Sequence, residues 1–281
     1  MTVNLQGKIE IASRTDEGQV RDHNEDYISD NPTLGIAVLA DGMGGLNAGE
    51  VASSMAVHLL MQELIAYRLG ESSLPAELPE EETELPIESR IVRKAVEMAN
   101  DAVFHSSQTQ LQHKGMGTTV VVALYYDNRV SIAHIGDSRV YRFRNNVLEQ
   151  VTKDHSFVQE LIDKGLYTKE EARTSDKKNV VTRALGVAPF VEVECHQYDA
   201  EVGDVYLMCS DGLHDLVPDQ NIERAFMELS GNLTELANYL VELANANGGK
   251  DNISVILTRI VKPYPQEEEA GLIKRIVNWF E

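Results

Sequence analysis

The order of strand-like and helix-like segments is the feature that most constrains the fold of this chain. Strand patterns occur at residues 8–14, 35–40, 117–152, 191–198, 204–210 and 253–261. Apolar residues on one helical face predict two helices at 49–69 and from 91 onward, and two more at 218–229 and 233–246. A parallel sheet would need regular alternation of strand and helix, which this order lacks. The order predicts instead antiparallel sheets packed face to face, with helices outside.

Shorter patterns predict the structure between these segments. Tight hairpin turns are expected at Asp127-Asn128 and at Asn145-Asn146, because each pair separates two alternating runs. A short helix is expected at about 156–164, followed by a polar, irregular stretch to about residue 180. Residues 71–90 combine prolines with a dense acidic run, which predicts an exposed loop.

Aspartates stand at the ends of the apolar strand segments. Asp41 follows GIAVLA, Asp211 follows VYLMCS and Asp251 precedes ISVILTRIV. A fourth, Asp137, follows AHIG. Carboxylates brought close together repel one another and raise one another's pKa, unless divalent cations neutralise them. Carboxylate and carbonyl oxygens select hard ions such as Mg²⁺ or Mn²⁺.

The acidic pair Glu25 and Asp26, in RDHNED, and the glycines of DGMGG extend this pattern. Gly42 leaves room for the backbone to approach a cation, and its carbonyl can itself be a ligand. Each part has an ordinary explanation when it stands alone, since an Asp-Gly pair is usually a turn and Asp137-Ser138 is typical of a cap. The recurrence of aspartates at strand ends, together with RDHNED, favours a metal site.

Composition limits the classes of partner and compartment. Asp plus Glu number 45 and Lys plus Arg 25, and a surface with the resulting net charge of −20 repels nucleic acid. Cys195 and Cys209 lack close spacing, which argues against a disulfide scaffold or a thiolate zinc site. The sequence contains no secretory-signal pattern and no window apolar enough for a membrane span, so we expect a cytoplasmic protein.

Taken together, RDHNED, LADGMGG, GMGTT, HIGDSR, SDGLHD and GGKDNISVI resemble, in order and spacing, the metal-dependent protein phosphatase family, the type 2C serine/threonine phosphatases. The resemblance extends from about residue 8 to 261, and the DGMGG form is similar to the bacterial branch. It implies a catalytic domain over residues 1–261 with an α+β fold. This fold is a four-layer α-β-β-α sandwich, in which two antiparallel sheets are flanked by helix pairs. Two or three Mn²⁺ or Mg²⁺ ions would lie at one end of this sandwich.

The resemblance implies a role for each matching residue. Asp41 would bridge two cations, and the carbonyl of Gly42 would bind one of them. Asp211 and Asp251 would bind the other. The implied reaction is hydrolysis of phosphoserine or phosphothreonine by direct attack of a metal-bridging hydroxide, without a covalent phosphoenzyme. The chain contains no Cys-x5-Arg nucleophile motif, which agrees with that chemistry.

Three further acidic residues take supporting roles in the same resemblance. Glu25 and Asp26 would hold metal-bound waters or orient Asp41. Asp137, together with Asp211, would form the third metal site of bacterial relatives.

Arg21 would bind the substrate phosphate in this family. Its guanidinium can contact two phosphate oxygens at once, which a lysine cannot do. Without the resemblance, a surface salt bridge with Asp22 or Glu25 would be the expected role of this arginine.

One departure from the family concerns the residue after Asp-Gly. Many eukaryotic members have a histidine there, proposed as the acid that protonates the leaving alkoxide, whereas this chain has Met43. His155, in KDHS, is a candidate by position alone, because a lone histidine is more often packed or at the surface. The acid is therefore left unassigned.

Two segments have no assigned chemistry. Residues 165–185 correspond to a mobile flap in relatives, and their basic side chains either contact the phosphoprotein or are simply solvated. The C-terminal extension, 262–281, has an apolar helical stripe that would pack on the core, form a dimer, or dock to a partner or a membrane surface. With only Lys274 and Arg275 as basic residues in the stripe segment, we do not expect strong membrane binding.

The main hypothesis is an active cytoplasmic phosphatase that acts on phosphoproteins and opposes a serine/threonine protein kinase. A catalytically silent, phosphoprotein-binding module on the same fold is the second hypothesis, and a two-metal phosphohydrolase of nucleotides is the third. The second is disfavoured because every implied metal position is filled. The third is disfavoured by the net charge of −20 and by the lack of a base-stacking motif.

Overall fold

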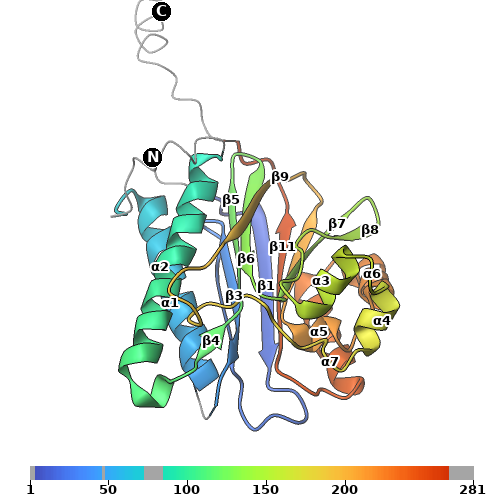
Figure 1. Cartoon of the computed structure of the whole chain (residues 1–281). Helices are drawn as coiled ribbons and strands as arrows, with labels where there is room; N and C mark the ends of the chain where they lie inside the picture. Colours follow the sequence, from blue (N-terminus) through green and yellow to red (C-terminus); the bar gives the residue numbers. More distant parts are fainter. Residues whose placement is uncertain (1–3, 46–47, 73–84, 266–281) are drawn as a thin grey trace, which may run out of the picture.

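The fold consists of two antiparallel sheets packed face to face, with helices on both outer faces (Figure 1). The computed structural model describes residues 4–45, 48–72 and 85–265. Neighbouring strands within both sheets are antiparallel. The expected α+β fold with four layers is therefore confirmed.

In the described part of the chain, one sheet has five strands and the other has six. The order in the five-stranded sheet is β1 (Ile9–Asp16), β11 (Ile253–Ile260), β10 (Val205–Cys209), β7 (Arg139–Arg144) and β8 (Val147–Gln150). The order in the six-stranded sheet is β2 (Asp26–Asn31), β3 (Ile36–Met43), β5 (Val120–Tyr126), β6 (Arg129–Ile135) and β9 (Glu194–Asp199), with β4 (Gly117–Thr118) beside β3. Because β1 pairs with β11, segments from the beginning and the end of the fold close the same sheet.

Helix pairs cover the outer faces of the two sheets (Figure 1). The pair on the six-stranded sheet is α1 (Ala48–Leu69) and α2 (Ile87–Thr109), and the pair on the five-stranded sheet is α6 (Asp219–Leu229) and α7 (Leu233–Ala246). The shorter helices are the 3₁₀ helix η2 (Leu111–His113), α3 (Phe157–Asp163), α4 (Lys169–Thr174) and α5 (Asp211–His214). Helix α2 begins inside the stretch 71–90 that the sequence predicts as a loop, because Pro86 is tolerated at a helix start.

Apolar side chains form three buried layers, one between the sheets and one under each helix pair. Along β3, Val38 and Ala40 pack against α1 and α2, whereas Ala37 and Leu39 pack between the sheets. Both faces of this strand are therefore dry. This explains why it reads as a continuous apolar run rather than as an alternating one.

Both predicted hairpin turns are confirmed. The φ angles are 45° and 54° at Asp127 and Asn128, and 52° and 62° at Asn145 and Asn146. Two consecutive positive φ values are typical of the type I′ turn, which matches the twist of the strands that it joins.

Strand β2 and helix α4 are among the elements that the sequence patterns do not predict, as are the short helices η2 and α5. Strand β2, DYISDN, has few apolar residues and pairs along one side of β3. Helix α4 lies within the stretch expected to be irregular, and a capping box stabilises its start. Thr168 Oγ1 accepts a hydrogen bond from the Glu171 N–H at 3.2 Å, and the Glu171 carboxylate accepts one from the Thr168 N–H at 2.8 Å. The T-x-x-E spacing is the signal that would have found this helix.

The strand-end aspartates lie at one end of the sandwich. Asp41 lies near the end of β3, Asp211 directly follows Ser210 at the end of β10, and Asp251 precedes β11. Asp137 lies where the chain crosses from β6 in one sheet to β7 in the other. Antiparallel pairing places the end of one strand beside the start of the next, so these positions converge.

The described chain continues past the expected boundary at residue 261. Tyr264 is 2% exposed, its N–H donates to Asn128 Oδ1 at 2.6 Å, and its hydroxyl donates to the Arg129 carbonyl at 3.1 Å. The apolar stripe expected in the extension 262–281, and most of the acidic loop expected at 71–90, lie outside the described residues.

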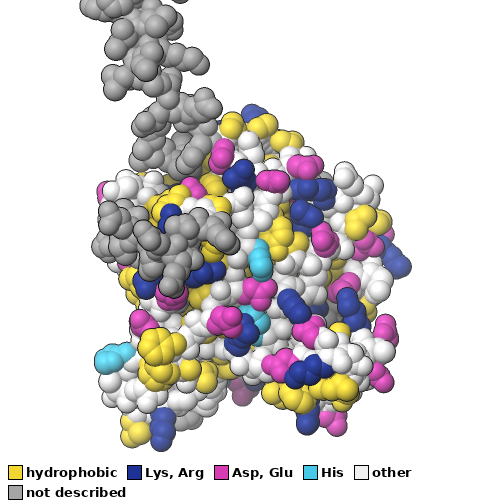
Figure 2. All heavy atoms as spheres, turned by 45° about the horizontal axis from the view of Figure 1, so that its top comes forward, with side chains coloured by type: hydrophobic (Ala, Val, Ile, Leu, Met, Phe, Trp, Pro, Cys, Tyr) yellow, Lys and Arg dark blue, Asp and Glu magenta, His cyan; other side chains and the backbone are white. Residues whose placement is uncertain are grey.

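The surface carries charges of both signs. On the face shown in Figure 2, acidic and basic side chains are interspersed, and hydrophobic side chains form separate groups. The net charge of −20 is therefore not gathered into one acidic patch on this face. Among the helices of the described residues, none combines the length and the apolar character needed to cross a bilayer.

Candidate active site

Asp26 and Asp41 face each other across two neighbouring strands. They are paired at the end of the β2–β3 ladder, and Ser210 Oγ donates a hydrogen bond of 2.8 Å to Asp26 Oδ2. Thr119 fixes the backbone of Asp41, since its Oγ1 accepts from the Asp41 N–H at 3.1 Å and its N–H donates to the Asp41 carbonyl at 2.8 Å. Strand pairing therefore positions both carboxylates.

Gly42 lies where no side chain fits. A Cβ at this position would lie 2.1 Å from the carbonyl oxygen of Gly49 and 2.7 Å from that of Glu25. The first turn of α1 therefore packs directly on the strand that carries Asp41. The N-terminal end of a helix carries partial positive charge, which favours nearby carboxylates such as Glu25.

Three more carboxylates join this pair. Asp211 begins α5, Asp251 precedes β11, and Asp137 follows β6. Asp26 and Asp137 are buried, whereas Asp41, Asp211 and Asp251 keep part of their surface open to solvent. We call these five residues the carboxylate cluster. The open surface leaves a path by which an ion from solvent can reach it.

Burial and mutual repulsion raise pKa values in the carboxylate cluster. Desolvation, followed by the charges of Asp26 and Asp211, raises the pKa of Asp41 well above its usual range. Desolvation, followed by the charge of Asp137, does the same to the pKa of Asp211. Desolvation also raises the pKa of Asp26 to about 6 and that of Asp137 to about 7. Such groups ionise together at neutral pH only where positive charge is supplied.

The residues of the carboxylate cluster fit divalent cations. Asp26 Oδ1 is buried without a hydrogen-bond partner, which leaves a strong acceptor unsatisfied. In the described part of the chain, no three of these carboxylates have oxygens within 4.8 Å of one another. Oxygen donors of this kind suit Mg²⁺ or Mn²⁺ rather than zinc.

Arg21 lies beside the carboxylate cluster, on the loop between β1 and β2. Its Nη2 is 2.6 Å from Asp251 Oδ2, so its partner is a member of the cluster rather than Asp22 or Glu25. The hydrogen bond with Asp251 raises the pKa of Arg21. Because its side chain is 49% exposed, the guanidinium also remains accessible to a ligand.

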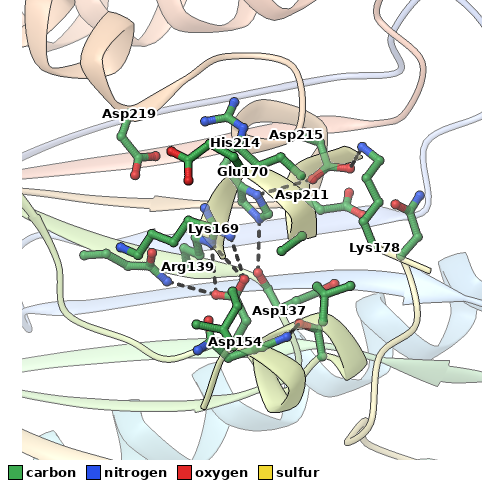
Figure 3. Close-up of a pocket in the computed structure, with 18 of the residues that line it drawn as sticks. Asp137, Arg139, Asp154, Lys169, Glu170, Lys178, Asp211, His214, Asp215 and Asp219 are labelled. Atoms are coloured by element: carbon green, nitrogen blue, oxygen red, sulfur yellow. Dashed lines mark hydrogen bonds and ion pairs between the residues drawn. The ribbon is translucent and has the colours of Figure 1, made fainter. Parts of the chain in front are cut away.

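A pocket of about 250 Å³ opens beside Asp137 and Asp211 (Figure 3). Helices α3 and α4 line one side, and α5 with the start of α6 lines the other. Lys178, from residues 165–185, donates a hydrogen bond to Asp215, which directly follows α5. We call residues 165–185 the flap segment. The pocket beneath it is continuous with the carboxylate cluster.

His155 is packed inside the protein. Its Nδ1 accepts from the Gly136 N–H at 3.2 Å, and its Nε2 lies 3.2 Å from Glu194 Oε2. Its ring is stacked on that of His134, with ring centres 4.7 Å apart and an angle of 13° between the planes. His134, His155 and Glu194 have donor atoms close together, but one ion cannot lie in the planes of two stacked rings. The structure therefore favours the packed-histidine interpretation.

Three residues that the sequence did not single out support the site. Asn252 accepts from the Glu25 N–H at 2.8 Å and donates to the carbonyls of two other residues in the β1–β2 loop. Buried His214 donates from Nε2 to the Asp137 carbonyl at 3.1 Å, and burial lowers its pKa to about 4. Asp215 pairs with the flap segment. The spacing of Asp211 and Asp215, one helical turn apart in SDGLHD, is the signal that could have found the last of these.

Comparisons with known proteins show what this chain is similar to. The model of the family described as protein phosphatase 2C matches residues 13–245. The serine/threonine phosphatase stp of Listeria monocytogenes is 40% identical over 247 residues, which cover 87% of this chain and 93% of the relative. The serine/threonine protein phosphatase PstP of Mycobacterium tuberculosis is 37% identical over 253 residues, which cover 90% of this chain and 45% of that protein.

Solved structures share the architecture. The catalytic domain of the serine/threonine phosphatase PstP in complex with two manganese ions superposes with a TM-score of 0.76 and 36% identity, over 90% of this chain and 99% of the other. The serine/threonine phosphatase Stp1 of Staphylococcus aureus superposes with a TM-score of 0.78 and 34% identity, over 90% of this chain and 95% of the other. Together with the family match over most of the described residues, this shows that the chain belongs to the protein phosphatase 2C family.

Proposed function

We propose that this protein is a metal-dependent serine/threonine protein phosphatase, which hydrolyses phosphoserine and phosphothreonine in phosphoproteins. The observation that carries the proposal is the meeting of Asp41, Asp211 and Asp251, from three distant parts of the chain, with Arg21 beside them. Similarity to named serine/threonine phosphatases, one of them solved with two manganese ions, supports the reaction and the metal.

The residues that would hold Mn²⁺ or Mg²⁺ are Asp41, the Gly42 carbonyl, Asp211 and Asp251, with Asp137 and Asp211 at a third position. When bound, such ions supply an activated water and neutralise charge on the phosphoryl oxygens. The chain's own contribution is to hold these oxygens at the ends of paired strands and at the start of α5. The two hydrogen bonds between the Asp41 backbone and Thr119 support that role.

Arg21 would bind the substrate phosphate. Its guanidinium, held by Asp251 and partly exposed, offers parallel N–H donors to two phosphate oxygens. Asp26, which faces Asp41 and accepts from Ser210, would keep the Asp41 carboxylate in place. Glu25, tied to Asn252 through its backbone, would orient a water at the same end of the sandwich.

The test is turnover of a phosphothreonine peptide by the purified full chain. We expect hydrolysis that requires Mn²⁺ or Mg²⁺ and stops when a chelator is added. Asp41→Asn and Asp211→Asn should each lower kcat/KM at least about 100-fold, because each removes a charge that holds the metal. Asp199→Asn is the matched control, since its side chain is 82% exposed and lies at the end of β9 that pairs with Arg129, away from the cluster.

Three outcomes would contradict the proposal. Full activity in both cluster variants would remove the metal-site assignment. Turnover of nucleotides without turnover of phosphopeptides would favour the nucleotide phosphohydrolase. Binding of phosphopeptides by folded protein, without turnover at any metal concentration, would favour the catalytically silent module.

The proposal also covers the opposing kinase, the cellular compartment and the division of the chain into domains. A serine/threonine protein kinase would generate the substrates, since such an enzyme forms phosphoserine and phosphothreonine in proteins. We place the protein in the cytoplasm, where the free, buried Cys195 and Cys209 suit a reducing environment.

We also divide the chain into a catalytic domain, 1–261, and an extension, 262–281, that docks a partner or self-associates. A pull-down with and without residues 266–281 tests the extension.

A further inference from the structure

One buried amide side chain joins the two ends of the loop between β1 and β2. Asn252 is 5% exposed. Its Oδ1 accepts a hydrogen bond of 2.8 Å from the Glu25 N–H, and its Nδ2 donates to the carbonyls of Glu17 and His23, both at 3.0 Å. Because these partners lie at the beginning and at the end of residues 17–25, a single side chain closes this loop.

An asparagine amide fits these partners closely. It has two N–H donors and an acceptor oxygen, which is the set that two carbonyls and one N–H require. Rotation of the amide by half a turn would place its NH₂ group against the Glu25 N–H, so the partners determine its orientation. An aspartate of the same shape would instead place a carboxylate oxygen against the two carbonyls. Since Asn252 is buried, loss of its side chain leaves the loop's polar groups without these partners.

The first part of the loop packs on the segment that leads into Asn252. The Gln19 N–H donates to the Gly249 carbonyl at 2.7 Å, and a Cβ on Gly18 would lie 2.3 Å from the Asp251 carbonyl oxygen. Gly18 has a φ of 81°, in the region that glycine adopts readily. The loop therefore lies directly against the segment that ends in Asn252.

Arg21 lies in the middle of this loop, and its side chain returns to the same segment. Residues 17–25 contain neither a helix nor a strand, so the position of Arg21 depends on how the ends of the loop are held. Its Nη2 lies 2.6 Å from Asp251 Oδ2, and the Asn252 N–H donates to Asp251 Oδ1 at 2.9 Å. Asn252 is therefore connected to Arg21 both through the loop and through the carboxylate that Arg21 contacts.

We propose that Asn252 is a positioning residue of the phosphatase reaction, which closes residues 17–25 and thereby holds the Arg21 guanidinium where it binds the substrate phosphate. This proposal rests on the proposed function and deepens it. Asn252 acts through Arg21, because its own amide is buried and already engaged with the loop backbone. Without the amide the ends of the loop can separate. Phosphate binding must then also order the loop, which weakens the binding.

The test is a double-mutant cycle between Asn252→Ala and Arg21→Ala, measured on a phosphothreonine peptide at saturating Mn²⁺. In the parent, Asn252→Ala should lower kcat/KM about tenfold, mainly through KM, and should weaken inhibition by inorganic phosphate by a similar factor. In the Arg21→Ala background the same substitution should change kcat/KM less than about twofold, because the group through which Asn252 acts is absent. Asn252→Ser keeps one hydroxyl and should give a smaller loss in the parent.

Asn100→Ala is the matched control. Asn100 is 1% exposed and makes the same set of hydrogen bonds to a different loop. It accepts from the Gly186 N–H at 3.0 Å and donates to the carbonyls of Ala188 and Pro189 at 3.1 and 3.4 Å. Its loss should therefore have the same effect on kcat/KM with and without Arg21.

Amide hydrogen exchange adds a readout that does not require activity. Exchange within residues 17–25 should become faster in Asn252→Ala and stay unchanged in Asn100→Ala. Additive losses in the cycle, a fall in kcat with unchanged KM and phosphate inhibition, or unchanged exchange in the loop would each overturn the positioning role. Absence of metal-dependent peptide turnover by a parent protein with a protected loop would instead overturn the proposed function.

Discussion

At the scale of single residues, the site depends on groups that compensate an unfavourable charge. Asp41 is stable at the end of a dry strand because Thr119 holds its backbone and because its side chain keeps a path to solvent. Asp26 is buried, and Ser210 satisfies only one of its carboxylate oxygens. Arg21 provides a positive charge to Asp251 at the edge of the same cluster. These partners come from distant parts of the sequence.

Replacement of Arg21 tests the bidentate contact with phosphate. Arg21→Lys keeps the charge but loses the planar pair of donors, so kcat/KM for a phosphopeptide should fall about tenfold, or about 1.4 kcal/mol. The measurement is steady-state kinetics at saturating Mn²⁺. The Lys8→Arg exchange, at the opposite end of β1 and outside the cluster, is the control. Unchanged kinetics in Arg21→Lys would show that the phosphate is bound by other groups.

At the scale of elements, local chemistry decides some structures and pairing decides others. The β5–β6 and β7–β8 turns are encoded by their own residues, because Asn and Asp tolerate positive φ angles. The same holds for α4, whose capping box lies within four consecutive residues. Strand β2 is different, because its mixed sequence becomes a strand only where β3 offers an open edge.

The β7–β8 turn gives a clean test of the local contribution. Asn146 is exposed, with a φ of 62°. Asn146→Ala should lower the free energy of unfolding by about 1 kcal/mol, because a Cβ without a polar group disfavours this backbone region. Asn146→Gly should be neutral or slightly stabilising. Urea denaturation of the three proteins measures the difference, and equal stability of the Ala and Gly variants would contradict the turn assignment.

At the scale of the whole molecule, the sandwich brings together acidic groups that repel one another. The two sheets and three apolar layers hold the strand ends in place, and the carboxylate cluster forms where the ends meet. Repulsion among these carboxylates lowers the free energy of unfolding and so offsets part of the stabilisation from apolar burial. Binding of cations should remove this destabilisation.

Metal binding should be visible in stability as well as in activity. Mn²⁺ at 100 times its Kd should raise the free energy of unfolding by about 2.7 kcal/mol. Asp211→Asn should lose most of this gain. Without metal, however, the variant should be at least as stable as the parent, because one repelling charge is gone. Urea denaturation with Mn²⁺ and with a chelator distinguishes these states, and a metal-free variant clearly less stable than the parent would argue against repulsion in the cluster.

The sequence by itself determined the periodic elements, the hairpin turns and the types of residue at the strand ends. These follow from interactions between near neighbours, such as the alternation of β6 or the paired asparagines at 145–146. It also supplied, through the order of its motifs, the family resemblance that the comparisons support.

Only the tertiary structure decided which groups meet. The partner of Arg21 is Asp251 rather than a neighbour in sequence, His155 is packed against His134, and the pocket lies between the flap segment and α5. Each of these contacts joins residues from different strands or helices, and their free energy depends on distance and desolvation in three dimensions. The spacing of residues along the chain does not reveal their distance in space or their desolvation. These contacts could therefore be identified only in the folded structure.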